Sequence, residues 1–182
     1  AGRFGHDQTM ISVRPIQALI GAAALAGALC IAAPASAGSL KIEPIGFSPA
    51  LQTKLERTLG EREGVHLQRM VARALDRALE DTPSGAPVRI EVTIVDAQAN
   101  RPTFRQLADN VSLDYSGSFG IGGAALTAIL RDADGREIGQ IAHRYYGHDI
   151  ELAAYGPDWA DAQRAIDQFA RKVARAYREA AI

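Results

Sequence analysis

The sequence predicts an α+β fold: a mostly antiparallel sheet of about four strands with helices packed on one face, in the order β-α-β-β-β-α. Three observations support this prediction. Apolar β-branched residues alternate with polar ones over residues 88–94, which indicates a half-buried strand. A turn-forming segment at 132–135 separates two extended segments and predicts a hairpin. Apolar residues at helical spacing over 159–177 predict an amphipathic helix.

A secretory signal peptide is expected before this domain. Arg14 follows Met10, an apolar run occupies 16–33, and the small residues 35–37 resemble a cleavage site. A membrane-spanning helix is the alternative, since such a helix needs roughly 18 to 20 apolar residues. However, the run is mostly alanine and glycine and lacks a basic stop-transfer flank. We expect cleavage after Ala37 and a periplasmic location.

The remaining chain, residues 38–182, has a length typical of a single domain. Residues 1–9 carry no apolar pattern and are expected to be an expression remnant or upstream translation. The formal net charge of the full 182-residue chain is −1 at pH 7. Such a balance produces no long-range attraction for nucleic acid, so no nucleic-acid partner is expected.

The single cysteine, Cys30, lies within the apolar run. Cleavage after Ala37 would leave no thiol for disulfides, nucleophilic catalysis or thiolate metal sites. Lipidation of Cys30 is the alternative, but Leu29 stands where a lipoprotein signal needs a small residue. Membrane anchoring is therefore not expected unless Cys30 is lipidated.

The first half is expected to contain an edge strand, a helical region and the strand at 88–94. Alternation over 40–47 predicts the edge strand, because Pro44 cannot donate to a ladder. Ser48 and Pro49 are typical of a helix start. Glycines at 60 and 64 interrupt the helical pattern, which leaves either two helices or one bent helix before a loop at 81–87.

The second half is expected to begin with a long connection over 97–110 that has room for a helical turn. Apolar residues of 113–121 share one face, whereas Leu126 and Leu130 have the opposite parity. A strand with a bulge at 122–123 would place both sets in one core. The segment 137–146 is predicted to be the partner strand. The final helix is expected to begin near Asp158 or Asp161.

Two motifs are candidate sites of chemistry. His143, His148 and Asp149 could supply metal ligands or acid–base groups, but strand residues five apart face opposite sides unless the strand ends near 147. Gly120, Gly122 and Ala125 match a dinucleotide motif that requires a following helix, which this segment is too short to supply. No catalytic residue, metal or cofactor is therefore expected.

Aromatic residues concentrate in the second half, at Tyr115, Tyr145, Tyr146, Tyr155 and Trp159. Tyr145 and Tyr146 are adjacent on a strand and must face opposite sides. One of them is expected to be exposed or to lie under the segment that contains Tyr155. Such a residue could anchor a partner, and packing is the competing interpretation. The candidate binding residues are Tyr145, Tyr146, Tyr155, His143 and His148.

The segment Gly122–Glu179, about a third of the chain, resembles uncharacterised-domain families of small exported envelope lipoproteins in Gram-negative bacteria. The resemblance depends on three groups of residues: Gly123-Ala124-Ala125-Leu126 on a strand; the turn Asp132-Ala133-Asp134-Gly135 with Glu137-Ile138 after it; and Trp159, Asp161, Ala162, Phe169 and Ala170 on the last helix. It implies residence in the envelope and no assigned reaction. The absence of a lipoprotein signal at Cys30 departs from those families.

Two functions follow from these expectations. The first is a non-catalytic periplasmic or cell-envelope binding or assembly module, whose partner would be another cell-envelope protein. The alternative is a metal-dependent or hydrolytic periplasmic enzyme that uses His143, His148 and Asp149.

Overall fold

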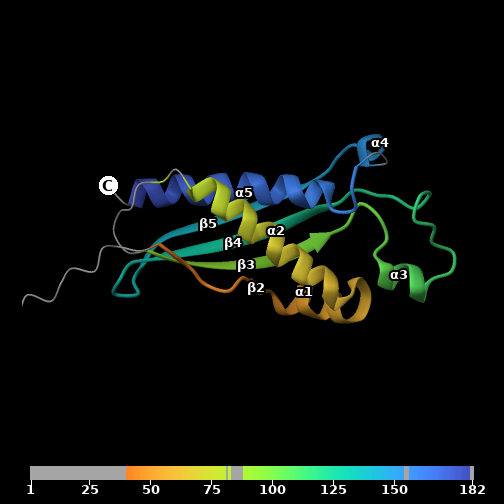
Figure 1. Cartoon of the computed structure of the whole chain (residues 1–182), viewed down its shortest axis with the longest axis horizontal. Helices are drawn as coiled ribbons and strands as arrows, with labels where there is room; N and C mark the ends of the chain where they lie inside the picture. The colour runs from red at the N-terminus through yellow and green to blue at the C-terminus, as the bar shows by residue number, and fades with distance from the viewer. Residues whose placement is uncertain (1–39, 81, 83–87, 154–155, 181–182) are drawn as a thin grey trace, which may run out of the picture. The chain divides into compact units, whose positions relative to one another are not determined.

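A computed structural model describes residues 40–80, 82, 88–153 and 156–180. The α+β prediction is confirmed in this part of the chain: three long antiparallel strands build the sheet, and the long helices pack on one side of it (Figure 1). The predicted signal peptide, Cys30 and Tyr155 lie outside the described residues. None of the described helices combines the length and the apolar character that crossing a membrane would require.

The described elements have the following bounds. The first half contains β1 (Lys41–Ile42), β2 (Gly46–Phe47), α1 (Pro49–Lys54), the π-helical segment η1 (Leu55–Leu59), α2 (Glu61–Leu79) and β3 (Arg89–Gln98). The second half contains α3 (Phe104–Asp109), β4 (Gly123–Arg131), β5 (Glu137–Tyr146), α4 (Ile150–Ala153) and α5 (Ala160–Ala180).

The sheet has the strand order β1-β3-β4-β5, and β2 also pairs with β3. Strands β3, β4 and β5 are antiparallel neighbours, whereas β1 and β2 run parallel to β3 along its other edge. Pro44 lies between these two short pieces, so the predicted edge strand forms but is interrupted where a backbone donor is missing. At the opposite side of the sheet, β5 is the terminal strand.

The first helix begins as predicted: the Ser48 hydroxyl accepts a hydrogen bond from the Leu51 backbone N–H at 3.1 Å, and Pro49 occupies the first turn. Gly60 decides between two helices and one bent helix. Its φ of 100° is favourable only for glycine, and this conformation separates η1 from α2. The region therefore forms two helices, and Gly64 lies inside the second.

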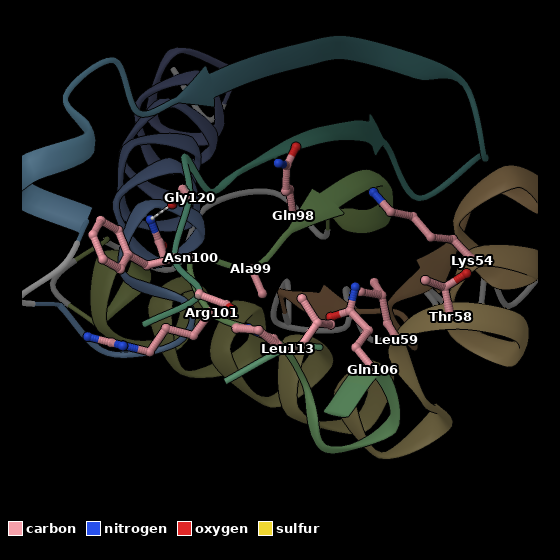
Figure 2. A pocket seen from close by; sticks show the side chains of 13 residues that line it. Lys54, Thr58, Leu59, Gln98, Ala99, Asn100, Arg101, Gln106, Leu113 and Gly120 are labelled. Atoms are coloured by element: carbon pink, nitrogen blue, oxygen red, sulfur yellow. Dashed lines mark hydrogen bonds between the residues drawn. The ribbon is translucent and has the colours of Figure 1, made fainter. Parts of the chain in front are cut away.

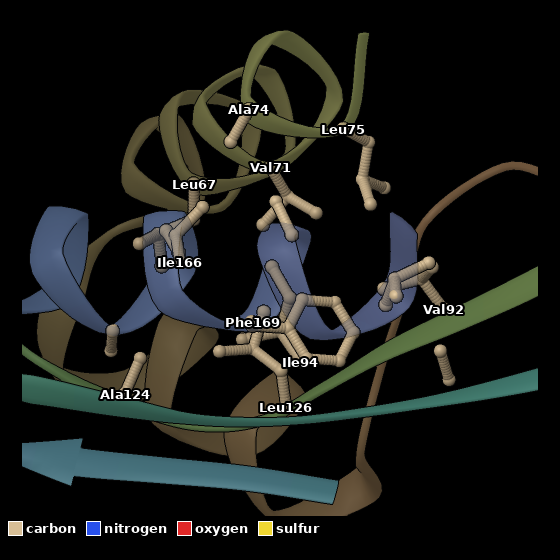
Figure 3. Close-up of a cluster of buried hydrophobic side chains, with 14 of the residues drawn as sticks. Leu67, Val71, Ala74, Leu75, Val92, Ile94, Ala124, Leu126, Ile166 and Phe169 are labelled. Atoms are coloured by element: carbon tan, nitrogen blue, oxygen red, sulfur yellow. The ribbon is translucent and has the colours of Figure 1, made fainter. Parts of the chain in front are cut away.

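The core lies between α5, α2 and the inner face of the sheet (Figure 3). Phe169 on α5 is fully buried and lies between Val71 of α2 and Leu126 of β4 in this view. The predicted apolar stripe of the final helix is buried along its whole length: Trp159, Ala162, Ile166, Phe169, Val173 and Tyr177. The predicted outward basic residues are exposed: Arg171, Lys172, Arg175 and Arg178.

The prediction of a strand over 113–121 is wrong. This segment forms turns, in which Asp114 accepts backbone hydrogen bonds from Gly117 through its side chain and from Ser118 through its carbonyl. These local bonds satisfy the backbone without a ladder. The expected bulge at 122–123 is also absent from the described sheet. The strand register shifts instead within β3, between Ile94 and Asp96, and near the end of β4.

Candidate functional site

The predicted histidine cluster is divided between two environments. His143 lies on β5 next to α5, with the Lys172 Nζ 3.0 Å from its Nδ1, whereas His148 and Asp149 follow the strand and are exposed. Burial, followed by the positive charge of Lys172, lowers the pKa of His143 and favours the neutral ring. Among the described residues, no group of three or more His, Cys, Asp or Glu side chains could hold a metal ion.

The two adjacent tyrosines face opposite sides of the sheet, as predicted. Tyr145 packs against the core, and Tyr146 lies on the outer face. The Tyr146 hydroxyl donates a hydrogen bond to Asp96 Oδ2 at 2.5 Å. The guanidinium carbon of Arg144 lies 5.1 Å from the centroid of the Tyr146 ring. Of the two described candidate tyrosines, Tyr146 is therefore the one with polar contacts on the outer face.

Two residues that carry no sequence signal complete this group. Asp96 lies at the register shift in β3, and Lys54 is the last residue of α1. Lys54 Nζ donates to Asp96 Oδ1 at 3.0 Å and to the Ala97 carbonyl at 2.8 Å. We call Lys54, Asp96 and Tyr146 the Asp96 network. No local motif marks it, because its members come from α1, β3 and β5.

The pKa values of Asp96 and Tyr146 are shifted by burial and by the hydrogen bonds within the Asp96 network. Burial would raise the pKa of Asp96, but hydrogen bonds from Tyr146 and Lys54 outweigh this effect and lower the pKa. Burial, followed by the hydrogen bond to Asp96, raises the pKa of Tyr146 to about 12. At neutral pH the carboxylate is ionised and the phenol keeps its proton. The Tyr146 hydroxyl can therefore donate its proton in a hydrogen bond to the Asp96 carboxylate.

A cleft of about 380 Å³ adjoins the Asp96 network (Figure 2). Lys54 and Leu59 line it from α1 and η1, Gln98 from the end of β3, and Gln106 from α3. Phe119, which is 39% exposed, adds an aromatic surface. The volume lies in the range of small-ligand pockets, which is roughly 300 to 1,000 Å³. Apolar walls with amide groups could receive a side chain of a partner.

A buried polar cluster holds the loops at this end of the sheet. Asp161 on α5 is 4% exposed, and its Oδ2 accepts hydrogen bonds from Asn100 Nδ2 at 2.6 Å and from the Gly122 N–H at 3.1 Å. Asn100 Nδ2 also donates to the Gly120 carbonyl, and Arg164 donates to Asp161 Oδ1 at 3.0 Å. We call these residues the Asp161 cluster.

The Asp161 cluster explains the glycine motif of the sequence analysis. A Cβ atom on Gly122 would lie 2.5 Å from Asn100 Oδ1, so a side chain does not fit there. Strand β4, and not a helix, follows Gly122. The motif therefore has neither the helix N-terminus nor the open space that a pyrophosphate group would need. Gly122 permits close packing against Asn100, whereas a Cβ atom on Gly120 would have no other atom within 4 Å.

Comparisons with known proteins leave the family open. No family model and no curated protein sequence matches the chain. A solved structure described as a "putative lipoprotein from Caulobacter crescentus CB15" is similar at 20% sequence identity, covering 63% of this chain and 80% of that chain with a TM-score of 0.29. A TM-score this low supports no conclusion about fold or function.

Proposed function

We propose that this chain is a non-catalytic module of the periplasm or cell envelope, which binds another envelope protein through the uncovered side of its sheet. The observation that carries the proposal concerns the described residues: the long helices cover one face of β3, β4 and β5, whereas Thr93, Thr127 and Ala142 on the other face are partly or fully exposed. We call this second surface the open face. The signal-peptide pattern before Ala37 supports the location.

The composition of the open face suits contact with a protein. At its centre, Thr127 of β4 lies opposite Thr93 of β3 and Ala142 of β5, so the middle is flat and bears small side chains. One end carries the Arg131–Glu91 ion pair, with 3.0 Å between Nε and Oε1. The Asp96 network occupies the other end. Small side chains at the centre allow a partner to approach closely, and the charged ends correspond to the polar rim of a protein interface.

Site-specific photo-crosslinking in cells tests this function. A photoreactive amino acid would replace Thr127 on the open face, Phe119 at the cleft, or Arg73 on the exposed side of α2 as the control. We expect adducts with one defined envelope protein from Thr127 or Phe119 and none from Arg73. Adducts from Arg73 alone would show that the partner binds the helical side, and the proposal would be wrong.

The proposed location has a separate test. N-terminal sequencing of the protein from the periplasmic fraction is expected to begin at Gly38. A chain that begins at a lipidated Cys30, or an uncleaved chain in the membrane fraction, would contradict cleavage after Ala37. If the protein is found in the cytoplasm, the proposed envelope location is wrong.

A further inference from the structure

The free edge of β5 presents regularly spaced backbone groups. The Gly147 N–H donates to the Gly122 carbonyl at 2.9 Å, which marks this pair as hydrogen-bonded in the antiparallel register. Hydrogen-bonded and non-bonded pairs alternate along such a ladder. The N–H and C=O groups that point away from β4 therefore belong to alternate residues of β5: Gln140, Ala142, Arg144 and Tyr146.

The two edges of the sheet differ in their protection. Along β3, the short strands β1 and β2 cover the edge on both sides of Pro44. Strand β5 is ten residues long, contains no proline, and has no neighbour among the described strands on its outer side. Natural sheets usually shorten, interrupt or cover such an edge, because it can pair with another chain. A long unprotected edge is thus a candidate binding surface.

Basic side chains flank this edge on both faces. On the helical face, Lys172 of α5 contacts His143 of β5, and Arg171 lies close enough for its charge to act on the same histidine. On the open face, Arg144 extends from β5 itself. Asp167, the acidic residue closest to Arg171 and Lys172 in the sequence of α5, forms an ion pair with Arg77 of α2.

We propose that the β5 edge binds an extended, acidic segment of a partner protein, which adds to the sheet as a further strand. The backbone of the segment would pair with Ala142 and its neighbours, and its acidic side chains would lie beside Lys172 and Arg171. This inference rests on the proposed binding function. It adds a second contact, at the edge that borders the open face, and it gives the chemistry of the partner segment. Strand addition is a common mode of peptide recognition.

Charge favours an acidic segment over a second copy of this chain. Antiparallel pairing of two β5 edges would place two α5 helices side by side along the new sheet. Lys172 and Arg171 of one copy would then approach the same residues of the other, and like charges at close range disfavour association. An acidic strand neutralises these charges.

A fluorescent peptide that alternates threonine with glutamate tests the proposal, with binding to the folded mature chain measured by fluorescence anisotropy. We expect binding of this peptide and none of a control peptide that has lysine in place of glutamate. N-methylation at the threonines or at the glutamates blocks donors on one side of the peptide only. Strand addition requires that one of these two methylated peptides loses binding and the other retains it.

Three protein variants locate the site. Ala142→Pro removes an N–H that faces the free edge, which is a position where sheets tolerate proline. Ala142→Pro and Lys172→Glu should each weaken peptide binding about tenfold, since each removes a hydrogen bond or charge contact. Arg73→Glu on α2 makes the same charge change away from β5 and should leave binding unchanged. Thermal melts establish that each variant is folded.

Several results would overturn the proposal. Three results would exclude an acidic added strand: both methylated peptides bind equally well, the lysine peptide binds as well as the glutamate peptide, or a folded Ala142→Pro protein binds the glutamate peptide as well as the wild type does. A dimer in sedimentation experiments that Ala142→Pro converts to monomer would identify a second copy as the occupant instead. If the peptide does not bind but Thr127 or Phe119 forms crosslinks in cells, the binding function stands and this inference alone is wrong.

Discussion

Replacing Asp161 with alanine is expected to destabilise the fold strongly, because this carboxylate is the acceptor for two buried donors. Asn100 Nδ2 and the Gly122 N–H both donate to Asp161 Oδ2, at 2.6 and 3.1 Å. Asn100 is 1% exposed, so water cannot easily replace the lost acceptor. The Arg164 guanidinium, by contrast, is accessible and can turn to solvent.

The magnitude follows from the stranded donors. Each buried donor left without an acceptor costs about 1 to 3 kcal/mol, which gives a loss of about 2 to 6 kcal/mol for Asp161→Ala. A domain of this size has a total stability of roughly 5 to 15 kcal/mol. Asp161→Asn retains a carbonyl oxygen for both donors and loses the pairing with Arg164 and the charge near the helix N-terminus. Its cost should be about 1 kcal/mol.

Urea denaturation monitored by circular dichroism measures both variants. We expect the alanine protein to unfold at a clearly lower urea concentration and the asparagine protein to stay close to the wild type. Equal, large losses would show that the charge of Asp161 matters, and not its acceptor geometry. If the alanine protein stays within about 0.5 kcal/mol of the wild type, the Asp161 cluster does not hold these loops together.

Three further outcomes are expected. Phe169→Ala should lower the free energy of unfolding by about 3 to 5 kcal/mol because the ring is fully buried, whereas exposed Arg171→Ala should change it by at most about 0.5 kcal/mol. Equal, small shifts in the melting temperatures of the two variants would show that α5 does not belong to the core. Gly122→Ala should destabilise the protein because the new Cβ would clash with the Asn100 side chain, whereas Gly120→Ala should not, because no atom lies within 4 Å of its new Cβ. Similar melting temperatures of the two variants would contradict this packing argument. Folding lowers the pKa of Asp96, so its stabilising contribution exists above the pKa of the unfolded carboxylate and is lost as pH falls through the lower folded value. The stability difference between wild type and Asp96→Asn, measured in urea from pH 7 downward, should therefore disappear in acid, and a constant difference would refute the role of its charge.

Several elements could be predicted because their signals are local. The alternation over 88–94 and the turn at 132–135 correctly indicated β3 and the β4–β5 hairpin, and the bounds 137–146 match β5. Ser48 and Pro49 marked the start of α1. The stripe on the final helix predicted its buried face, because one helical period determines which residues share a side.

The mistaken strand over 113–121 shows the limit of such signals. Its apolar residues alternate, but Tyr115 and Phe119 are 46% and 39% exposed. Asp114 and neighbouring residues satisfy the backbone locally, and the periodicity of side chains does not report those hydrogen bonds. Alternation predicts a strand only where a partner strand is available.

The sequence by itself determined the order of the main elements, the edge position of the segment around Pro44, and the opposite orientations of Tyr145 and Tyr146. Each depends on neighbouring residues and on a fixed backbone period. The tertiary structure decided which distant groups meet: Lys54 with Asp96 and Tyr146, and Asn100 with Asp161. It also decided that β5 is the terminal strand and that Lys172 lies beside it. Such contacts join residues far apart in the chain, and their geometry arises only when the sheet and helices pack together.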